Sequence, residues 1–451
     1  MEQLVKAQRD YFNTNATKPV AFRIEQLQKL KALLKANTDQ LTEAVFQDFG
    51  KGSFETILTE LVLVHQEIDE AVRNLAQWAA AKTVPTDAFN QPGESFIMPE
   101  PLGVSLVIGA WNYPLNLTLV PAVSAIAAGC TVVLKPSRQT AHCSQLMTAL
   151  INTHFAPEFF VSVEGGRDET TALLEQKFDK IFFTGSVPVG KIVYQAAAKH
   201  LTPVTLELGG KSPAIVLADA DLDNAARKLV WGKFINGGQT CIAPDYVYVP
   251  RALESAFLER VKAEIAAAQY SIANKNFAQI ITIENTERLV HLIDPAKVYL
   301  GGTYNVAERF IEPTVLTNIT WDDAVMADEI FGPLLPVLAY DSLAEVIAAV
   351  KARPKPLALY LFTADEAAQQ QVLSEVSFGG GAINETILHL ANGALPFGGV
   401  GDSGIGNYHG EAGFRSFSHY KSILKKPVSA APDFRYSPQT DDKLAIALSM
   451  I

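Results

Sequence analysis

Two residues of this chain have the types and the setting for joint chemistry, the thiol of Cys241 and the carboxylate of Glu207. Cys241 closes the loop Gly237-Gly238-Gln239-Thr240-Cys241, where the glycines could leave its sulfur accessible. Glu207 lies in the apolar strand pattern Val204-Thr205-Leu206-Glu207-Leu208, which runs into Gly209-Gly210. A nucleophile together with a group that can activate water is the minimum requirement for covalent acyl chemistry.

The other two cysteines have settings typical of structural residues. Cys130 follows Ala127-Ala128-Gly129 and is expected in the core, and Cys143 lies in a helical pattern and is expected to be half buried. The three spacings match neither a disulfide framework nor a zinc site, so no metal is expected and a reducing compartment is favoured. Taken alone, Cys241 is as compatible with a structural role as with a nucleophilic one.

Glu207 is the single charged residue of its strand pattern. A carboxylate is costly to bury without a partner, and burial would raise its pKa toward that of a useful base. The alternative is a carboxylate paired with Lys211 or with a backbone N–H group.

An alternation of short apolar strands and helices must position Glu207. The expected strands are Val104–Ala110, Thr131–Lys135, Phe160–Glu164, Lys180–Thr184 and Pro203–Leu208, with helices near Leu117–Ala128, Gln139–Thr153, Glu169–Gln176 and Val189–Lys199. Strands that are apolar throughout are buried on both faces, and repeated strand–helix units imply a parallel sheet. The pattern predicts an α/β fold with a Rossmann-like, doubly wound sheet that binds a nucleotide.

The remaining segments predict a second domain and a bridging element. A further strand–helix alternation after Gly210 contains Cys241, helical patterns span Val20–Phe49 and Glu60–Ala81, and a last strand is expected at Ser416–Lys421. The expected division is 1–82 and 101–208 for the cofactor domain, 209–410 for the catalytic domain, 83–100 and 411–428 for bridging and oligomerisation, and 429–451 for a C-terminal tail.

The turn after the fourth expected strand could hold a phosphate. Thr184-Gly185-Ser186 ends the strand and Gly190 opens the next helix, where free backbone amides favour an anion such as a pyrophosphate. The glycine pattern departs from G-x-G-x-x-G. Gly185 to Lys191 also reads nearly as a P-loop, but Ile192 stands where magnesium binding requires Ser or Thr.

Two more strand ends carry polar residues. Lys135 ends the second strand, and the carboxyl ends of parallel strands face the ligand crevice. Asn112 follows the first strand, and its amide could donate to an oxyanion. A solvated lysine and a plain turn residue are the alternatives.

The composition indicates a soluble globular protein, with 48% hydrophobic residues, 19% charged residues and a formal net charge of -11. This acidic balance argues against nucleic acid as a partner, because phosphate binding needs clustered Lys and Arg. No apolar run approaches the roughly 18 to 20 residues of a membrane helix, and the N-terminus lacks the features of a signal peptide. A cytoplasmic location is therefore expected.

Over nearly its whole length the chain resembles the aldehyde dehydrogenase superfamily, most closely the class-3, fatty- or aromatic-aldehyde branch. Tyr408-His409-Gly410 and Phe417-Ser418-His419 resemble the class-3 C-terminal signature. The other matching motifs, in the family's order, are Trp111-Asn112-Tyr113-Pro114, Leu134-Lys135-Pro136-Ser137, Phe183-Thr184-Gly185-Ser186, Leu206-Glu207-Leu208-Gly209-Gly210-Lys211, Gly238-Gln239-Thr240-Cys241, Glu329-Ile330-Phe331-Gly332-Pro333 and Leu395-Pro396-Phe397-Gly398-Gly399-Val400.

The resemblance implies a role for each matched residue. Cys241 would attack the aldehyde, the Asn112 amide and the Cys241 N–H would hold the oxyanion, and Glu207 would activate the water that releases the acid. NAD or NADP would be the cofactor. Lys135 would contact the adenosine ribose of the cofactor. Ser186, in the turn that also contains Thr184, Gly185 and Gly190, would contact the pyrophosphate. Glu329 would contact the nicotinamide ribose, and Phe331 would support the nicotinamide ring.

Arg138 departs from the family, which often has an acidic residue directly after Lys-Pro-Ser. A guanidinium in place of a carboxylate removes repulsion toward a 2′-phosphate and adds a donor. The hypothesis is that NADP is accepted; the alternative is an Arg138 that only faces solvent.

The expected substrate is an apolar aldehyde, aliphatic or aromatic, and the expected assembly is a homodimer. Residues that could line the substrate pocket are Tyr113, Asn116, Trp231, Ile387 and His389. Alternatives are a coenzyme A-acylating enzyme, against which Glu207 argues, a protein that kept the fold without activity, and a P-loop-like nucleotidase.

Overall fold

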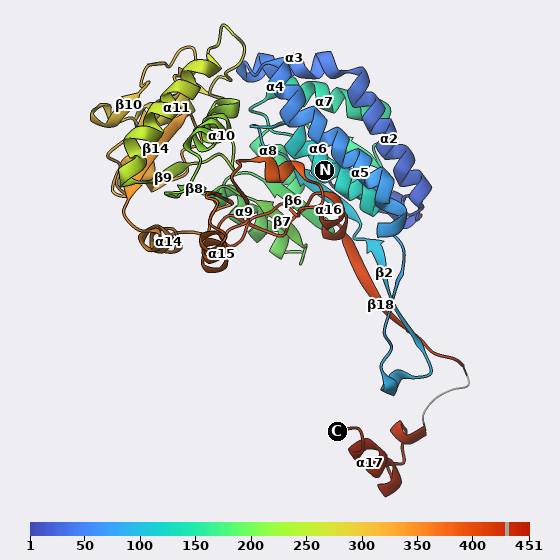
Figure 1. Cartoon of the computed structure of the whole chain (residues 1–451). Coiled ribbons are helices and arrows are strands. Elements are labelled where there is room, and N and C mark those ends of the chain that lie inside the picture. The colour runs from blue at the N-terminus through green and yellow to red at the C-terminus, as the bar shows by residue number, and fades with distance from the viewer. Residues whose placement is uncertain (429–432) are drawn as a thin grey trace.

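The computed structural model describes residues 1–428 and 433–451 as two α/β lobes with a long β arm (Figure 1). One lobe is built on a six-stranded sheet and the other on a seven-stranded sheet. The arm leaves the first lobe, and the C-terminal helix lies beyond its tip (Figure 1). Within the described residues, no helix combines the length and the apolar character needed to cross a membrane.

The six-stranded sheet confirms the predicted doubly wound fold. Its order is β17-β7-β6-β3-β4-β5, parallel except for β17. The chain enters at β3, moves outward to β5 and returns on the other side of β3 through β6, and ligands bind where the strand order reverses in this way. The strands are β3 (Val104–Ile108), β4 (Thr131–Lys135), β5 (Phe160–Ser162), β6 (Lys180–Thr184), β7 (Val204–Glu207) and β17 (Gly404–Ile405).

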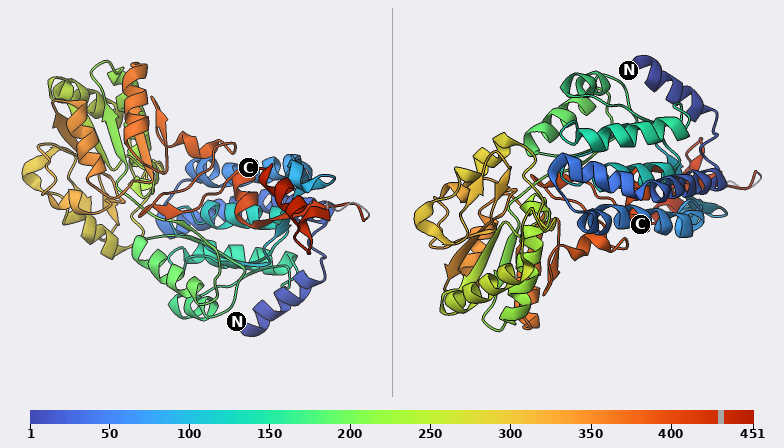
Figure 2. Two further views of the ribbon diagram at one scale, coloured as in Figure 1. Left: turned by 90° about the horizontal axis from the view of Figure 1, so that it is seen from below. Right: turned by 90° about the horizontal axis from the view of Figure 1, so that it is seen from above.

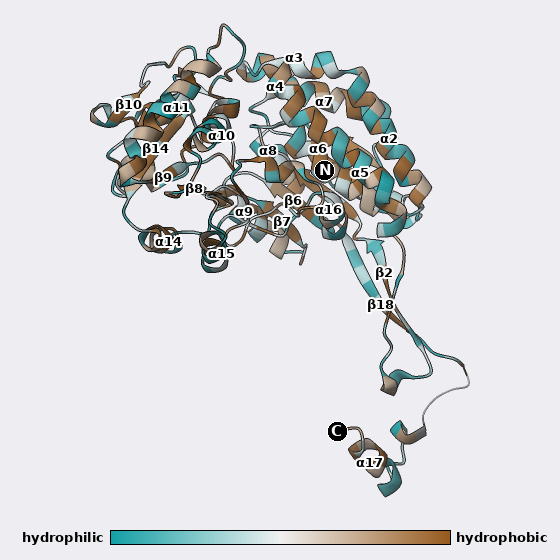
Figure 3. Cartoon of the chain, viewed as in Figure 1, coloured by the Kyte–Doolittle hydropathy of each residue, from teal (hydrophilic) through white to brown (hydrophobic). Residues whose placement is uncertain are grey.

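Helices cover both faces of this sheet (Figure 2). Every residue of α6 (Asn116–Ala128) is buried, because it packs against β3 and β4 on one side and α2 and α5 on the other. Its sequence is accordingly apolar all round rather than amphipathic, as the hydropathy colouring shows (Figure 3). The other crossover helices are α7 (Ala141–His154), α8 (Arg167–Leu174) and α9 (Val187–Ala198).

The N-terminal helical region is more broken than the sequence predicted. The expected stretch Val20–Phe49 is two helices, because the chain turns at Asn37, whose Nδ2 donates to the carbonyl of Leu33 at 2.8 Å. The expected helix from Glu60 begins instead inside a π-helical turn. The elements are α1 (Glu2–Asn13), α2 (Val20–Ala36), α3 (Thr38–Phe49), α4 (Ser53–Thr56), the π turn η1 (Ile57–Leu61) and α5 (Val62–Trp78).

The second lobe carries a sheet in the order β10-β13-β14-β9-β8-β15-β16, parallel except for β10. Its strands are β8 (Pro213–Val216), β9 (Tyr246–Pro250), β10 (Val298–Leu300), β13 (Thr314–Leu316), β14 (Leu334–Tyr340), β15 (Ala358–Phe362) and β16 (Gly380–Ile383). Its helices are α10 (Leu222–Phe234), α11 (Glu254–Ala268), α12 (Ile283–Val290), α13 (Ala324–Ala327), α14 (Leu343–Lys351) and α15 (Glu366–Glu375), with the small pair β11 (Tyr304–Asn305) and β12 (Phe310–Ile311).

The arm is a three-stranded antiparallel sheet in the order β1-β2-β18. The last strand runs over Ser418–Lys425, later than the expected Ser416–Lys421, because Gly410–Ser416 forms helix α16. The division into domains stays a prediction, although β17 lies in the range expected for the catalytic domain and pairs with β7 of the first sheet. Of the expected tail, 429–432 lie outside the described residues. The remaining elements are β1 (Lys82–Val84), β2 (Glu94–Pro101) and α17 (Asp441–Leu448).

Candidate active site

Asn112 lies in the loop between β3 and α6, at the point where the strand order reverses. Its side chain is buried, and its Nδ2 donates to the carbonyl of Gln239 at 3.1 Å. Tyr113 is also buried, and its hydroxyl lies 2.6 Å from Oγ1 of Thr240. The first lobe therefore presents Asn112 directly against the loop that carries Cys241 in the second lobe.

The Cys241 loop leaves α10 through three consecutive residues in left-handed conformation. Asn236, Gly237 and Gly238 have φ values of 56°, 61° and 76°. A Cβ at Gly238 would collide with the carbonyl oxygen of Gly332, so this position needs glycine for space as well as for its backbone. The two glycines noted in the sequence thus shape the turn that delivers the thiol.

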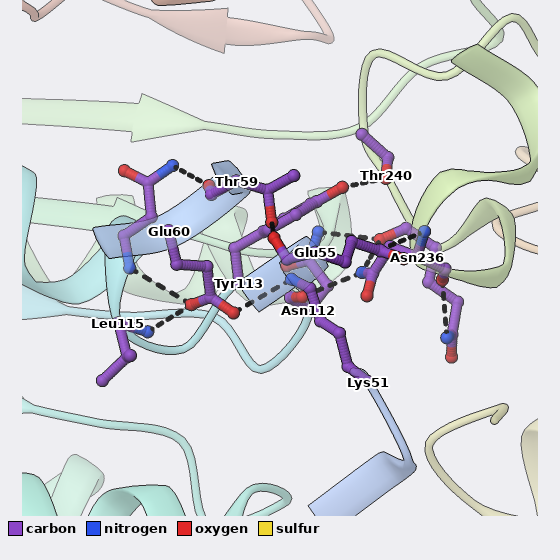
Figure 4. Close-up of polar contacts among 11 residues, drawn as sticks. Lys51, Glu55, Thr59, Glu60, Asn112, Tyr113, Leu115, Asn236 and Thr240 are labelled. Carbon is purple, nitrogen blue, oxygen red and sulfur yellow. Dashed lines mark hydrogen bonds and ion pairs between the residues drawn. The ribbon is translucent and has the colours of Figure 1, made fainter. Parts of the chain in front are cut away.

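Gln239 anchors this loop, a role that the sequence analysis missed. Its Nε2 donates to the carbonyls of Asn236 and Gln279, both at 3.0 Å, and its Oε1 accepts from the N–H of Ile281 at 2.9 Å. Asn236 in turn donates from Nδ2 to the carbonyl of Asn112 at 2.8 Å (Figure 4). The side-chain amide of Gln239 is buried with both its nitrogen and its oxygen hydrogen-bonded, which fixes the loop firmly. Cys241 and Asn112 are therefore held in one hydrogen-bonded unit.

Glu207 ends β7 with its side chain 3% exposed. Neither carboxylate oxygen has a hydrogen-bond partner among residues 1–428 and 433–451. Lys211, the alternative partner, instead contacts Asp245 at 2.5 Å. Burial raises the pKa of Glu207 well above its ordinary value, so its proton is held more tightly than in water.

Of the three cysteines, Cys241 is the one with accessible surface, and Cys130 and Cys143 are fully buried. Cys143 is therefore more buried than the half-buried state expected from its helix. Burial, followed by the negative charges of Glu329 and Glu207, raises the pKa of the Cys241 thiol. The thiol consequently needs a base before it can react as a thiolate.

A single cavity of about 640 Å3 joins these groups. Its walls come from the turns after β3, β6 and β7, from the Cys241 loop and from the segment around η1. Its lining contains these twelve predicted site residues: Asn112, Tyr113, Asn116, Thr184, Gly185, Ser186, Glu207, Trp231, Cys241, Glu329, Phe331 and Ile387. Leu58, Val62 and Leu63 also line it and were not predicted, because the π turn breaks the helical period that would have marked them.

The turn after β6 is suited to an anion at two of its predicted positions. The Thr184 hydroxyl is buried without a partner in the described part of the chain, and Ser186 precedes α9 without forming a cap hydrogen bond there. The first amides of a helix favour negative charge. Gly190 instead serves packing, because a Cβ there would press into Leu208.

Lys135 and Arg138 lie next to each other at the edge of the same crevice but outside the cavity lining described above. Lys135 is buried, and its Nζ donates to the carbonyls of Pro136 at 2.9 Å and Gly165 at 2.7 Å. Burial lowers the pKa of this amine. Arg138 is exposed and lies against Gly166, so both cations flank the turn before α8.

Glu329 and Phe331 also line the cavity. A Cβ at Gly209 would collide with Oε2 of Glu329, so the glycine after Leu208 makes room for this carboxylate. Burial, followed by the negative charge of Asp245, raises the pKa of Glu329 to about 8. Phe331 adopts a φ of 52° and packs edge-on against Trp111 at 5.3 Å between ring centroids.

His389 is the predicted pocket residue that does not line the cavity. Its ring packs against Tyr360 and Phe397, with centroid distances of 6.0 Å to each. Burial lowers its pKa to about 4, so it is neutral near pH 7. In the part of the chain that the structure describes, no group of three or more His, Cys, Asp and Glu side chains is arranged to hold a metal ion.

The doubly wound lobe and a cavity shared by a thiol, a carboxylate and an amide are the features of a dinucleotide-dependent oxidoreductase. The family model described as "Aldehyde dehydrogenase family" matches residues 1–423. The chain therefore belongs to the aldehyde dehydrogenase family and is an aldehyde dehydrogenase. The P-loop reading of Gly185 to Lys191 is correspondingly wrong.

Curated relatives place it in the class-3 branch. It is 44% identical to Aldehyde dehydrogenase family 3 comG of Dictyostelium discoideum, over 96% of this chain and 93% of the relative. It is 44% identical to 4,4'-diaponeurosporen-aldehyde dehydrogenase of Staphylococcus aureus, over 94% of both chains. It is 42% identical to the rat enzyme named "Aldehyde dehydrogenase, dimeric NADP-preferring", over 96% of this chain and 97% of the relative.

A solved structure described as the substrate-bound state of Staphylococcus aureus AldH is similar throughout. The TM-score is 0.97 at 41% identity, and the match covers 100% of this chain and 99% of the other. The predicted fold and enzyme class are therefore confirmed, and the predicted cofactor class, NAD or NADP, agrees with the name of the rat relative.

Proposed function

We propose that this enzyme oxidises apolar aldehydes, aliphatic or aromatic, to carboxylic acids through a thioester on Cys241. The observation that carries the proposal is the single cavity in which the Cys241 thiol meets the unpaired carboxylate of Glu207. A carboxylate with a raised pKa and no competing partner is a suitable general base. The amide of Asn112 opens onto the same space.

The chain's own residues have the following roles in this reaction. The Cys241 thiol loses its proton to water, its sulfur forms a bond to the aldehyde carbon, and the Asn112 Nδ2 and the Cys241 N–H donate to the resulting oxyanion. Bound NAD or NADP supplies the hydride acceptor, so that a thioester remains on Cys241. Glu207 then takes a proton from a water molecule, the water oxygen attacks the thioester carbon, and the C–S bond breaks to release the acid.

The residues present fit a dinucleotide. The unpaired Thr184 hydroxyl, Ser186 and the uncapped start of α9 offer donors to a pyrophosphate. Lys135 and Arg138 flank the neighbouring turn, where they would meet the adenosine ribose. Glu329, which also lines the cavity, would accept hydrogen bonds from the second ribose.

The exposed Arg138 supports the use of NADP. A guanidinium that binds a phosphate contributes about 1.5–3 kcal/mol, roughly a 10- to 150-fold effect. Arg138→Ala should therefore lower kcat/KM for NADP by that factor and change kcat/KM for NAD by less than about twofold. Arg227→Ala, in an exposed pair with Glu264 on the second lobe, is the control. Equal losses for both cofactors, or a strong wild-type preference for NAD, would contradict the assignment.

The cavity supports an apolar substrate. Leu58, Val62, Leu63, Leu117, Trp231 and Ile387 form much of its wall, and burying apolar surface is favourable in proportion to area. The Staphylococcus aureus relative bears the name 4,4'-diaponeurosporen-aldehyde dehydrogenase. Formation of NADPH from apolar aldehydes, with the free acid as product, tests the proposal. Acceleration by coenzyme A with an acyl-coenzyme A product would favour the acylating alternative instead.

We also propose a homodimer, in line with the name of the rat relative. The arm formed by β1, β2 and β18 stands away from both lobes and carries exposed apolar side chains at Phe89, Leu424 and Val428. Sedimentation analysis should give a particle mass of about twice the 48.9 kDa of one chain. A monomer at micromolar concentration would contradict this assembly.

A further inference from the structure

A buried ion pair lies beside the loop that carries Asn112, and the chemistry above gives it no role. Nζ of Lys51 lies 3.0 Å from Oε1 of Glu60, and both side chains are 0% exposed (Figure 4). Charges removed from water are costly unless their remaining hydrogen-bonding groups are satisfied. The contacts of each partner therefore show what the pair holds in place.

Glu60 holds the start of helix α6. Its Oε2 accepts hydrogen bonds from the backbone N–H groups of Leu115 at 2.7 Å and Asn116 at 3.4 Å. The first amides of a helix have no partner within the helix and create a positive potential. The residue at the N-cap position of α6, Leu115, supplies no cap hydrogen bond. Glu60, from a distant part of the sequence, therefore takes the place of a helix cap.

Lys51 contacts the same loop one residue after Asn112. Its Nζ lies 4.1 Å from the ring centroid of Tyr113, a favourable cation–π geometry when water is absent. The hydroxyl of that tyrosine reaches Thr240, next to Cys241. The ion pair thus braces the loop at Tyr113 and again at Leu115.

The π turn η1 lets Glu60 reach this position. Leu58 and Thr59 of the turn, and Val62 after it, line the cavity, whereas Glu60 is directed at the amides of α6. A π turn adds a residue to a helical turn and is often found at functional sites. One turn therefore contributes both a wall of the pocket and the brace behind it.

Glu55 extends the cluster to the other loop. It accepts a hydrogen bond from the N–H of Asn236 at 2.7 Å, and Asn236 donates to the carbonyl of Asn112 (Figure 4). Burial raises the pKa of Glu55, opposed by the charge of Lys51 and by this N–H donor. Lys51, Glu55 and Glu60 together thus contact both the loop that carries Asn112 and the loop that carries Cys241.

We propose that Glu60, held by Lys51, is a positioning residue that fixes the amide of Asn112 where the oxyanion forms. This inference rests on the proposed role of Asn112. Without the brace, the loop between Gly109 and Leu115 shifts, and a displacement of about 1 Å can cost on the order of 100-fold in rate. Glu60 itself lies behind the cavity wall and acts through the loop.

A double-mutant cycle tests the proposal. Glu60→Gln preserves the shape of the side chain, removes its charge and should lower kcat about 10- to 100-fold, with KM for the aldehyde and the affinity for NADP changed by less than about twofold. In an Asn112→Ala background, Glu60→Gln should lower kcat by less than about threefold, because the donor that Glu60 positions is already gone. Alkylation of Cys241 by iodoacetamide forms no oxyanion, and its rate should stay within about twofold of wild type.

Glu67→Gln is the matched control. Glu67 is another buried glutamate of this region, and it accepts from the N–H of Gly410 at 2.9 Å rather than from the Asn112 loop. Its effect on kcat should add to that of Asn112→Ala. If Glu60→Gln is recovered unfolded, Lys51→Met replaces it in the same cycle with the same expected pattern.

The outcomes separate the two claims. The positioning role alone would be overturned by either of two results. The first is an Asn112→Ala variant with lowered kcat to which Glu60→Gln adds its full loss. The second is a Cys241 alkylation rate that falls in parallel with kcat. An Asn112→Ala variant with unchanged kcat would refute the proposed oxyanion role, and with it the inference about Glu60.

Discussion

At the scale of single residues, Glu207 and Cys241 are both held in settings that disfavour their charged forms. Glu207 is buried without a partner among the described residues, and the Cys241 thiol is partly buried near the carboxylates of Glu329 and Glu207. A lone buried carboxylate destabilises the fold once it must ionise. Its presence therefore points to chemistry rather than to stability.

Replacing Glu207 by Gln should stabilise the protein in a pH-dependent way. The raised pKa means that the folded state keeps its proton while the unfolded chain ionises above about pH 4.3. Stability from this group is thus full below that pH and is lost as pH rises toward the folded-state pKa. Relative to wild type, Glu207→Gln should therefore gain stability at pH 8.5 and none near pH 4.5.

Calorimetry of both proteins at the two pH values measures the difference in Tm. Glu175→Gln, at an exposed glutamate after α8, is the control and should change Tm at neither pH. A Glu207→Gln variant that is less stable than wild type at pH 8.5 would show that the carboxylate is ionised and paired in the native protein.

At the scale of elements, the site depends on two loops that meet between the lobes. One runs from β3 into α6 and carries Asn112, and the other leaves α10 through left-handed residues and carries Cys241. Two hydrogen bonds tie the loops together, because Asn236 donates to the carbonyl of Asn112 and Asn112 donates to the carbonyl of Gln239. The backbone of the second loop is thus as necessary as its side chains.

Gly238→Ala should displace the Cys241 thiol indirectly, by moving the loop that carries it. The added methyl group meets the Gly332 carbonyl at a φ of 76°, so the loop must move. We expect a loss of about 2 kcal/mol in stability and roughly 100-fold in kcat. Gly393→Ala is the matched control, because a Cβ there would make only an ordinary contact of 3.8 Å with Cγ of Glu70. Urea unfolding and steady-state rates measure both effects, and wild-type kinetics for Gly238→Ala would contradict the structural role of this turn.

The sequence predicted the elements of the site better than their connections. Apolar strands identified the sheet, and glycine-rich turns identified Glu207 and Cys241, because burial and backbone freedom leave local signals. The bracing by Gln239 and Glu60 depends on contacts between distant segments, which no local pattern records. The position of His389 depends on such contacts as well, since its ring packs against Tyr360 and Phe397.

At the scale of the whole molecule, the cavity is lined by residues of both α/β lobes. The motifs spread along the chain, from Asn112 to Phe331, thereby come together in one volume of about 640 Å3. The volume and its apolar wall could not be predicted from the sequence, because they depend on how the lobes and the π turn pack.

The size and polarity of the cavity predict a preference for longer apolar aldehydes. Each buried methylene contributes about 0.8 kcal/mol, so kcat/KM should rise roughly fourfold per carbon until the chain fills the pocket. A series of straight-chain aldehydes measures this slope. A flat series, or highest activity with the shortest aldehyde, would contradict an apolar substrate.

Capture of the acyl-enzyme tests the central claim most directly. Glu207→Gln, mixed with an apolar aldehyde and NADP and quenched in acid, should accumulate a thioester that adds the acyl mass to the peptide containing Cys241. The same mixture with Cys241→Ser should show no adduct and no NADPH. An adduct on Cys130 or Cys143, or full turnover by Glu207→Gln with no adduct, would contradict the account.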